Sequence, residues 1–161
     1  MPVASYEFLN LVQHPIKFRL FLLTKLPSAF FSGLQVKSIS QTKAEVTVPY
    51  KWFTQNPFKS TYFACLAMGA EMSTGLLAMM NTYKSKPAIS MLVKGLEAVY
   101  YKKATGVTIF CCNDGAVIAA TIEQAIKSGE GRIIKVKATG TNKDGELIAE
   151  FFITWSFKSK I

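Results

Sequence analysis

The fold of this chain is decided by residues 60–81, which read STYFACLAMGAEMSTGLLAMMN. Glu71 is the one charged side chain among them, and the rest are apolar, small or hydroxyl-bearing. A helix that is apolar on every side is either buried in a protein core or spans a membrane. A carboxylate at its midpoint is costly in lipid, and the flanking segments alternate as they do in soluble sheet proteins. We therefore predict a buried central helix, with Ser60 or Thr61 as its N-cap.

Segments that favour β-structure lie on both sides of this helix. The predicted strands are residues 33–40, 43–48, 88–101, 106–112, 132–141 and 146–157. Gln41-Thr42 separates the first two strands, which are predicted to form a hairpin. Residues 116–127 suit a short helix that Asp114 caps and Gly129 ends.

The N-terminal segment, residues 3–26, is rich in large apolar side chains. Those at helical spacing are Leu9, Val12, Ile16, Leu20 and Leu23. Pro15 interrupts the run and suits the first turn of a second helix. We predict one or two amphipathic helices packed on the domain, with a helix on a membrane surface as the alternative. The first seven residues contain no basic region, so we do not expect a secretory signal.

These elements predict one α+β domain over residues 1–161, with residues 1–30 as an N-terminal helical extension. No linker, internal repeat or low-complexity run divides the chain. Several mainly antiparallel strands and one fully apolar helix are typical of a sheet that wraps around the helix.

Composition excludes several classes of function. Lys+Arg is 19 and Asp+Glu is 10, a net charge of +9, but only Arg19 and Arg132 are arginines. Base readout and bidentate phosphate binding favour arginine, so we expect a small anionic ligand and no nucleic acid. His14 is the single histidine, so we expect no metal site and no Ser-His-Asp triad.

The three cysteines are Cys65, Cys111 and Cys112, and no C-x-x-C motif is present. We expect reduced thiols in a cytoplasmic protein. Because Cys111 and Cys112 are adjacent in a predicted strand, they should point to opposite faces of the sheet.

Glu71 is the candidate catalytic residue. Burial would raise the pKa of its carboxyl group toward the range useful for a general base. The alternative is a structural carboxylate that pairs with a lysine such as Lys94 or reaches the surface at the edge of the helix.

The surroundings of Glu71 resemble a known motif. Asn56 is followed after five residues by Tyr62-Phe63-Ala64, and Glu71 lies nine residues after Tyr62. This resembles the hotdog-fold thioesterases, most closely the phenylacetate-pathway-like acyl-CoA thioesterases, whose motif has His-Gly-Gly at these three central positions. Asn56 and Glu71 match in type and spacing. The order of elements over residues 33–157 also resembles that fold, and the additional helices resemble those of an uncharacterised branch.

The resemblance implies a six-stranded, mainly antiparallel sheet around the central helix, and a homodimer or dimer of dimers with its site between subunits. It implies acyl-CoA hydrolysis with no cofactor, coenzyme A being part of the substrate. Glu71 would be the base or nucleophile, and Asn56 would orient the substrate or the water. Backbone amides near Phe63 and Ala64 would hold the oxyanion, and Tyr62 would lie with them at this oxyanion and substrate-binding site. The lysines that could meet coenzyme A phosphates, or could simply be solvated, are Lys51, Lys59, Lys84 and Lys86.

Two further interpretations stay open. The replacement of His-Gly-Gly by Tyr62-Phe63-Ala64 favours a hotdog protein that binds an acyl thioester or another small ligand without turnover. A protein associated with a membrane through residues 3–26 and 61–80 is the other. The methionines near Glu71 suit an acyl tunnel or a plain core, and they are Met68, Met72, Met79, Met80 and Met91.

Overall fold

The structure is a computed structural model that describes residues 3–160, so residues 1, 2 and 161 of the predicted domain lie outside the described residues. The helices are α1 (Val3–Gln13), α2 (Pro15–Lys25), α3 (Pro27–Ser32), α4 (Phe63–Thr82) and α5 (Gly115–Ser128), and a 3-10 turn, η1, spans Trp52–Thr54. The strands are β1 (Gln35–Ile39), β2 (Ala44–Val48), β3 (Ala88–Tyr100), β4 (Thr108–Cys112), β5 (Arg132–Thr141) and β6 (Leu147–Lys160). The predicted α+β class is confirmed.

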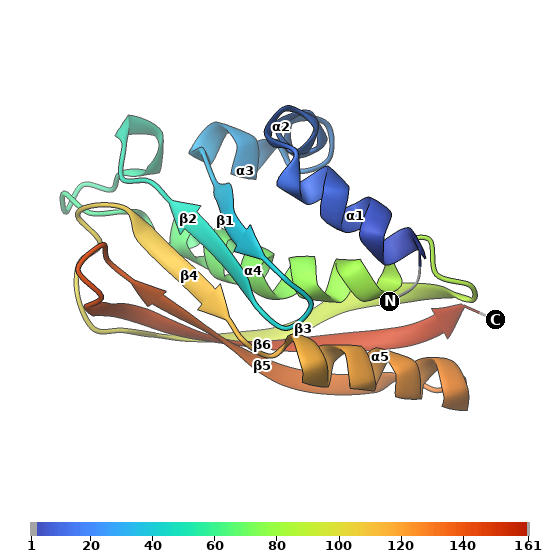
Figure 1. The fold of residues 1–161 in the computed structure, drawn as a ribbon. Coiled ribbons are helices and arrows are strands. Elements are labelled where there is room, and N and C mark those ends of the chain that lie inside the picture. The colour runs from blue at the N-terminus through green and yellow to red at the C-terminus, as the bar shows by residue number, and fades with distance from the viewer. Residues whose placement is uncertain (1–2, 161) are drawn as a thin grey trace.

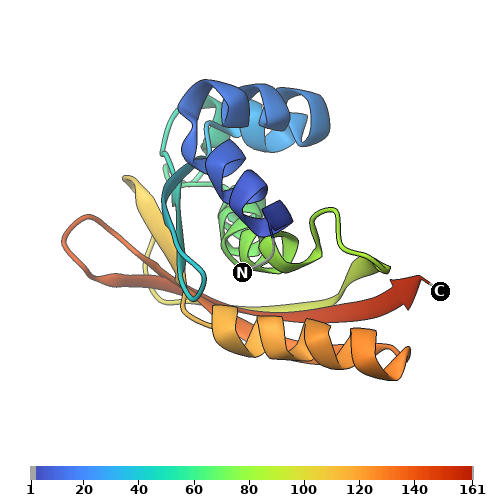
Figure 2. The ribbon, with the colours of Figure 1, turned by 45° about the vertical axis from the view of Figure 1, so that its right-hand side comes forward.

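The six strands form one antiparallel sheet in the order β1-β2-β4-β5-β6-β3. The sheet curves around α4, and α1, α2 and α3 lie on the other side of α4 (Figures 1 and 2). This is the predicted sheet wrapped around a central helix. β3 and β1 are the two edge strands, and β3 is 13 residues long.

Helix α4 is the core of the molecule. It is long and apolar enough to cross a membrane, but 67% of its most apolar window is buried inside the fold, as a core helix requires. Gly69 allows α4 to approach the sheet closely, because a Cβ there would lie 2.3 Å from Val48 Cγ2 of β2.

The predicted N-cap of α4 is wrong. The cap is Tyr62, whose side chain makes no capping hydrogen bond. The hydroxyl groups of Ser60 and Thr61 have other partners: Ser60 Oγ donates to Asn56 Oδ1 at 3.2 Å, and Thr61 Oγ1 donates to Ala104 O at 3.1 Å. The Ser60 bond lies within the loop before the helix, whereas the Thr61 bond joins this loop to the chain that follows β3.

Residues 3–26 form two helices that pack on the fold, as predicted, but Ile16, Leu20 and Leu23 of the predicted apolar face are exposed. Pro15 occupies the first turn of α2, and His14 is the N-cap. Phe8 of α1 and Phe18 and Leu22 of α2 are buried in the main core. The extension therefore covers part of the side of α4 that the sheet leaves open.

Helix α5 occupies the place where the sheet opens between β4 and β5. The two strands pair only at Ile109↔Thr141, Phe110↔Gly140 and Cys111↔Thr139, after which the chain turns into α5. The helix contacts α4, β5 and β6. Figure 2 shows it running along the sheet. Gly129 ends it as predicted, but the carboxylate of its N-cap Asp114 accepts a hydrogen bond from Lys137 N of β5 at 2.8 Å and does not cap the helix.

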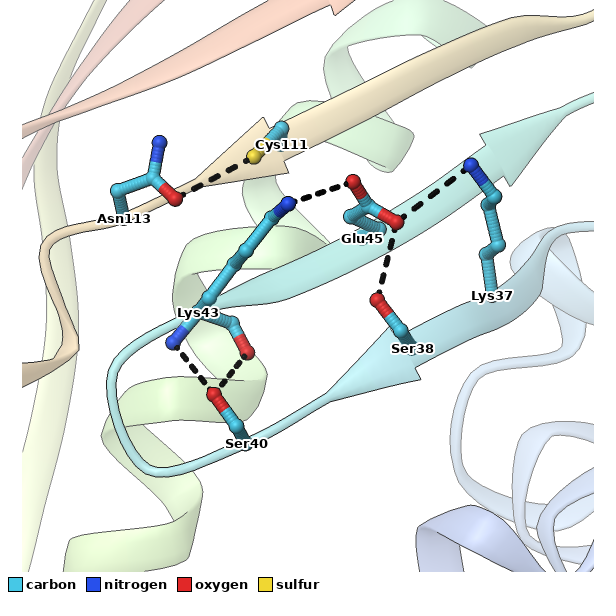
Figure 3. Close-up of polar contacts among 7 residues, drawn as sticks. All are labelled: Lys37, Ser38, Ser40, Lys43, Glu45, Cys111 and Asn113. Atoms are coloured by element: carbon cyan, nitrogen blue, oxygen red, sulfur yellow. Dashed lines mark hydrogen bonds and ion pairs between the residues drawn. The ribbon is translucent and has the colours of Figure 1, made fainter.

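A cluster of charged and hydroxyl side chains joins the two strands of the β1–β2 hairpin (Figure 3). The Glu45 carboxylate lies 2.9 Å from Lys43 Nζ and 3.5 Å from Lys37 Nζ, and it accepts a hydrogen bond from Ser38 Oγ at 3.0 Å. The hydrogen bond from Lys43 is the main cause of the lowered pKa of Glu45. Cys111 lies beside this cluster and is partly exposed, whereas Cys112 is buried on the other face and burial raises its pKa to about 12. The two cysteines thus point to opposite faces, as predicted.

Candidate functional site

The Glu71 side chain lines an apolar cavity of about 150 Å³ between α2, α4 and the sheet. The lining residues are Phe18, Phe21, Leu26, Glu71, Met72, Gly75, Leu76, Met79, Met91 and Trp155. Glu71 is the one ionisable group among them. Three of the methionines singled out in the sequence lie here.

The Glu71 carboxylate has no ion-pair or hydrogen-bond partner within residues 3–160. The alternative of a pair with Lys94 is not formed, and Lys94 is exposed on β3. Burial in apolar surroundings raises the pKa of Glu71, because it disfavours the charged form. An unpaired carboxylate with a raised pKa is suited to accept a proton from water.

Two residues on α4 shape the surroundings of Glu71. Gly75 leaves room for the carboxylate, because a Cβ there would lie 3.2 Å from Glu71 Oε1. Thr74 Oγ1 donates to the Glu71 carbonyl at 2.9 Å and accepts a hydrogen bond from Trp155 Nε1 at 2.9 Å. Trp155 on β6 is thereby held against the cavity.

The start of α4 lines a second cavity, of about 560 Å³. Its lining residues are Asn56, Pro57, Phe58, Ser60, Thr61, Tyr62, Phe63, Leu66 and residues 100–104. The N–H of Tyr62 donates to Thr54 O at 2.7 Å, so this residue of the predicted oxyanion site has no free amide. The first N–H of α4 with such a backbone acceptor is that of Cys65, which donates to the carbonyl of the N-cap Tyr62 at 2.9 Å. In the described chain the N–H groups of Phe63 and Ala64 have no such acceptor, and they lie at the positive end of the helix dipole.

Asn56 organises the loop that leads into α4. Its Oδ1 atom accepts hydrogen bonds from Phe58 N at 2.9 Å, Ser60 N at 3.3 Å and Ser60 Oγ at 3.2 Å. Its Nδ2 atom donates to Thr61 O at 3.4 Å. Asn56 is therefore close to the helix start, and its role toward a substrate stays a prediction.

One chain does not bring Glu71 and the helix start into a single cavity. Glu71 follows Phe63 by eight residues, which is about 12 Å along a helix. Ala64, Met68 and Glu71 nevertheless recur at intervals of three and four residues and are all partly exposed. They form an open stripe along α4.

The sheet is also uncovered beside this stripe. Leu96 and Tyr100 of β3 pair with Ile153 and Ala149 of β6, which are buried, so they share the face that packs on α4. Even so, Leu96 is 44% exposed and Tyr100 is 46% exposed. Nothing within residues 3–160 covers this part of the helix-facing surface.

The four candidate phosphate-binding lysines separate into two pairs. Lys51 and Lys59 precede α4, whereas Lys84 and Lys86 follow it, and a helix of 20 residues is about 30 Å long. Lys84 also pairs with Glu7 at 2.5 Å. One chain therefore cannot gather all four around one phosphate group.

Sequence reasoning missed several residues around the two cavities. Phe18, Phe21 and Trp155 reach Glu71 from elements distant in sequence, and no local pattern indicates them. The run Tyr100-Tyr101-Lys102-Lys103 lines the cavity at the start of α4. This combination of aromatic and cationic residues at the end of a predicted strand was a visible signal.

Comparison with known proteins shows which solved structures have a similar fold. Three of the similar solved structures illustrate this. A Pseudomonas aeruginosa protein of unknown function, described as a probable thioesterase, has a TM-score of 0.76 at 19% identity, covering 99% of both chains. A Chlorobaculum tepidum protein of unknown function has a TM-score of 0.75 at 17% identity, covering 91% of this chain and 97% of its own. A thioesterase from Haemophilus influenzae has a TM-score of 0.62 at 12% identity, covering 87% and 88%.

No curated protein matches the sequence. A family described as Domain of unknown function (DUF4442) matches residues 17–157, which span β1 to β5, most of β6, α4 and most of α2. The chain therefore has the hotdog fold that its sequence predicts, and it belongs to the DUF4442 family.

Proposed function

We propose that the protein hydrolyses an acyl thioester of coenzyme A and that Glu71 performs the chemistry. The observation that carries this proposal is the unpaired Glu71 carboxylate, with its raised pKa, in an apolar cavity. A carboxylate in such a setting serves as a general base or as a nucleophile. The thioesterases among the similar structures support the same reaction class.

In the proposed reaction Glu71 takes a proton from a water molecule that attacks the thioester carbonyl. The tetrahedral intermediate collapses, the C–S bond breaks, and the thiol leaves with a proton while the acyl group leaves as a carboxylic acid. The free N–H groups of Phe63 and Ala64 would stabilise the oxyanion, since they lie at a helix N-terminus. Direct attack by the Glu71 carboxylate, followed by hydrolysis of the anhydride, uses the same groups.

We propose that the complete site forms in a homodimer. Glu71 is about 12 Å along α4 from the amides of its own chain, so a second copy would supply the amides that face it. The open stripe of α4 and the uncovered Leu96 and Tyr100 support this arrangement, as does the long edge of β3. Pairing of two β3 strands would cover an exposed edge, which soluble proteins rarely leave free.

The charge around the helix start suits the phosphate groups of coenzyme A. Lys103 lines the cavity there, and its Nζ donates to Phe58 O at 3.4 Å without an acidic partner in the described chain. Lys102, by contrast, pairs with Glu146 at 2.5 Å. We propose Lys103, together with Lys51 and Lys59, as the phosphate-binding set.

The test is thiol release from acyl-CoAs that carry short, long and aromatic acyl groups. We expect wild type to release thiol and Glu71→Gln to lose activity by about 10²-fold or more. Glu123→Gln, which changes an exposed carboxylate on α5, is the matched control and should keep full activity. Equal activity of wild type and Glu71→Gln would contradict the role of Glu71.

The second candidate function is acyl-thioester binding without turnover. The observation that favours it is the pair Tyr62 and Phe63, whose rings meet at 4.9 Å between centroids and are both exposed at the helix start. These rings fill space where the related motif has histidine and glycine. A wild-type protein that is stabilised by coenzyme A thioesters but releases no thiol would favour this function.

A further inference from the structure

We propose that helix α2 sets the length of the acyl group that the Glu71 cavity accepts, with an upper limit of about six carbons or one phenyl ring. This inference rests on the proposed function, because it assigns the cavity beside Glu71 to the acyl group. It makes Phe18 and Phe21 the residues that determine chain-length specificity.

The cavity beside Glu71 is small. A volume of about 150 Å³ matches that of protein cavities that hold one benzene molecule. The lining is aliphatic, aromatic and thioether apart from Glu71, so the cavity favours an apolar occupant. An acyl group whose carbonyl lies near Glu71 would direct its tail into this space.

One wall of the cavity comes from the N-terminal extension. The sheet and α4 contribute Met91, Trp155 and the helix residues, whereas Phe18, Phe21 and Leu26 come from the N-terminal extension. The rings of Phe18 and Phe21 stack at 5.9 Å between centroids with an interplanar angle of 15°. Two stacked rings form a stiff wall, because each has few rotatable bonds.

Phe18 lines two cavities. On its other side lies a cavity of about 430 Å³ between α2 and β1, which includes Val12, Leu34 and Val36. Phe18 itself is buried, with 4% of its surface exposed. A shorter side chain at this position would therefore connect the small cavity with a larger, partly apolar one.

The experiment measures kcat/KM for straight-chain acyl-CoAs of two to sixteen carbons and for benzoyl-CoA. We expect wild type to prefer acyl groups of four to six carbons or benzoyl, with a loss of at least tenfold for twelve carbons, since one unaccommodated methylene changes kcat/KM by about 10-fold or more. Phe18→Leu and Phe21→Ala should move the optimum to longer chains by two carbons or more. Leu20→Ala is the matched control, because Leu20 is on the exposed side of the same helix.

Two outcomes overturn the inference while the proposed function stands. One is a wild-type optimum at twelve carbons or longer, and the other is an unchanged optimum in both phenylalanine variants that remain folded by circular dichroism. Calorimetric titration of Glu71→Gln with the same thioesters measures binding without turnover. If wild type hydrolyses none of them, the proposed function fails, and calorimetric titration of Phe18→Leu and Phe21→Ala beside wild type decides whether α2 sets the limit.

Discussion

The buried carboxylate of Glu71 serves the proposed reaction, but its charge lowers the stability of the folded protein at neutral pH. In the unfolded chain its carboxyl group titrates near the ordinary value of 4.5, and in the folded protein burial raises its pKa. The folded protein therefore binds this proton more tightly than the unfolded chain does. It follows that the contribution of Glu71 to stability falls as the pH rises through the window between the two pKa values.

We therefore expect Glu71→Gln to raise the melting temperature at pH 7 to 8, because the amide removes a buried charge that has no partner. Below the unfolded pKa both proteins are neutral at this position, so their melting temperatures should agree near pH 3.5. Thermal unfolding followed by circular dichroism over this pH range measures the difference.

Glu123→Gln is the control, because the pKa of Glu123 is shifted in the opposite direction. The hydrogen bond from Lys127 lowers the pKa of Glu123, so its loss should not stabilise the protein at pH 7. A lower melting temperature of Glu71→Gln at pH 7 would mean that the carboxylate has a stabilising partner, and the proposed setting of Glu71 would be wrong.

At the scale of the element, α4 depends on its small residues for close packing. A Cβ at Gly69 would lie 2.3 Å from Val48 Cγ2 and 3.0 Å from the Phe110 ring. We expect Gly69→Ala to destabilise the protein by about 1–3 kcal/mol, although alanine favours the helix, because overpacking a tight contact outweighs propensity. Chemical denaturation with urea measures this change.

Gly106→Ala is the matched control, since nothing lies within 4 Å of a Cβ at that position. It should leave stability unchanged or raise it by up to about 1 kcal/mol. Equal stabilities of Gly69→Ala and wild type would show that α4 can move away from β2 and β4 without loss.

Sequence periodicity located the elements well because each one has a strong local pattern. The run of apolar residues around Glu71 predicts α4, and the alternation of Ile134, Val136 and Ala138 predicts β5. The errors occur where a polar side chain could bond to more than one partner. Asp114 and Thr61 both find acceptors or donors that are distant in the chain, and no local rule anticipates them.

The candidate site was predictable only in part for the same reason. Glu71 stands out because it is one charge in an apolar helix. The walls of its cavity depend on how α2 crosses α4 and on the register that places Trp155 opposite Val93, and both are set by packing over the whole chain.

At the scale of the whole molecule, the uncovered face beside β3 predicts association of two copies. We expect wild type to be a dimer, or a dimer of dimers, by light scattering coupled to size-exclusion chromatography. Leu96→Asp should give monomers and abolish thiol release together, because it places a charge on the helix-facing side of the edge strand.

Leu92→Asp is the companion variant, because Leu92 pairs with Ser156 on the opposite face of the same strand. We expect Leu92→Asp to keep the dimer. If wild type is a dimer of dimers, a change from four copies to two in this variant would show that the second interface lies on the outer face. A wild-type protein that is monomeric and fully active would contradict the shared site.

The pairing of β3 has a consequence for how the protein is made. Its one partner in the sheet is β6, so a ribosome must synthesise residues 101–160 before β3 can be paired along its whole length. At about 5–20 residues per second this takes about 3–12 s. Throughout that interval a 13-residue strand that carries Leu92, Leu96 and Val99 has both edges free. We therefore expect slowed translation after residue 100 to increase aggregation of the nascent chain through this segment.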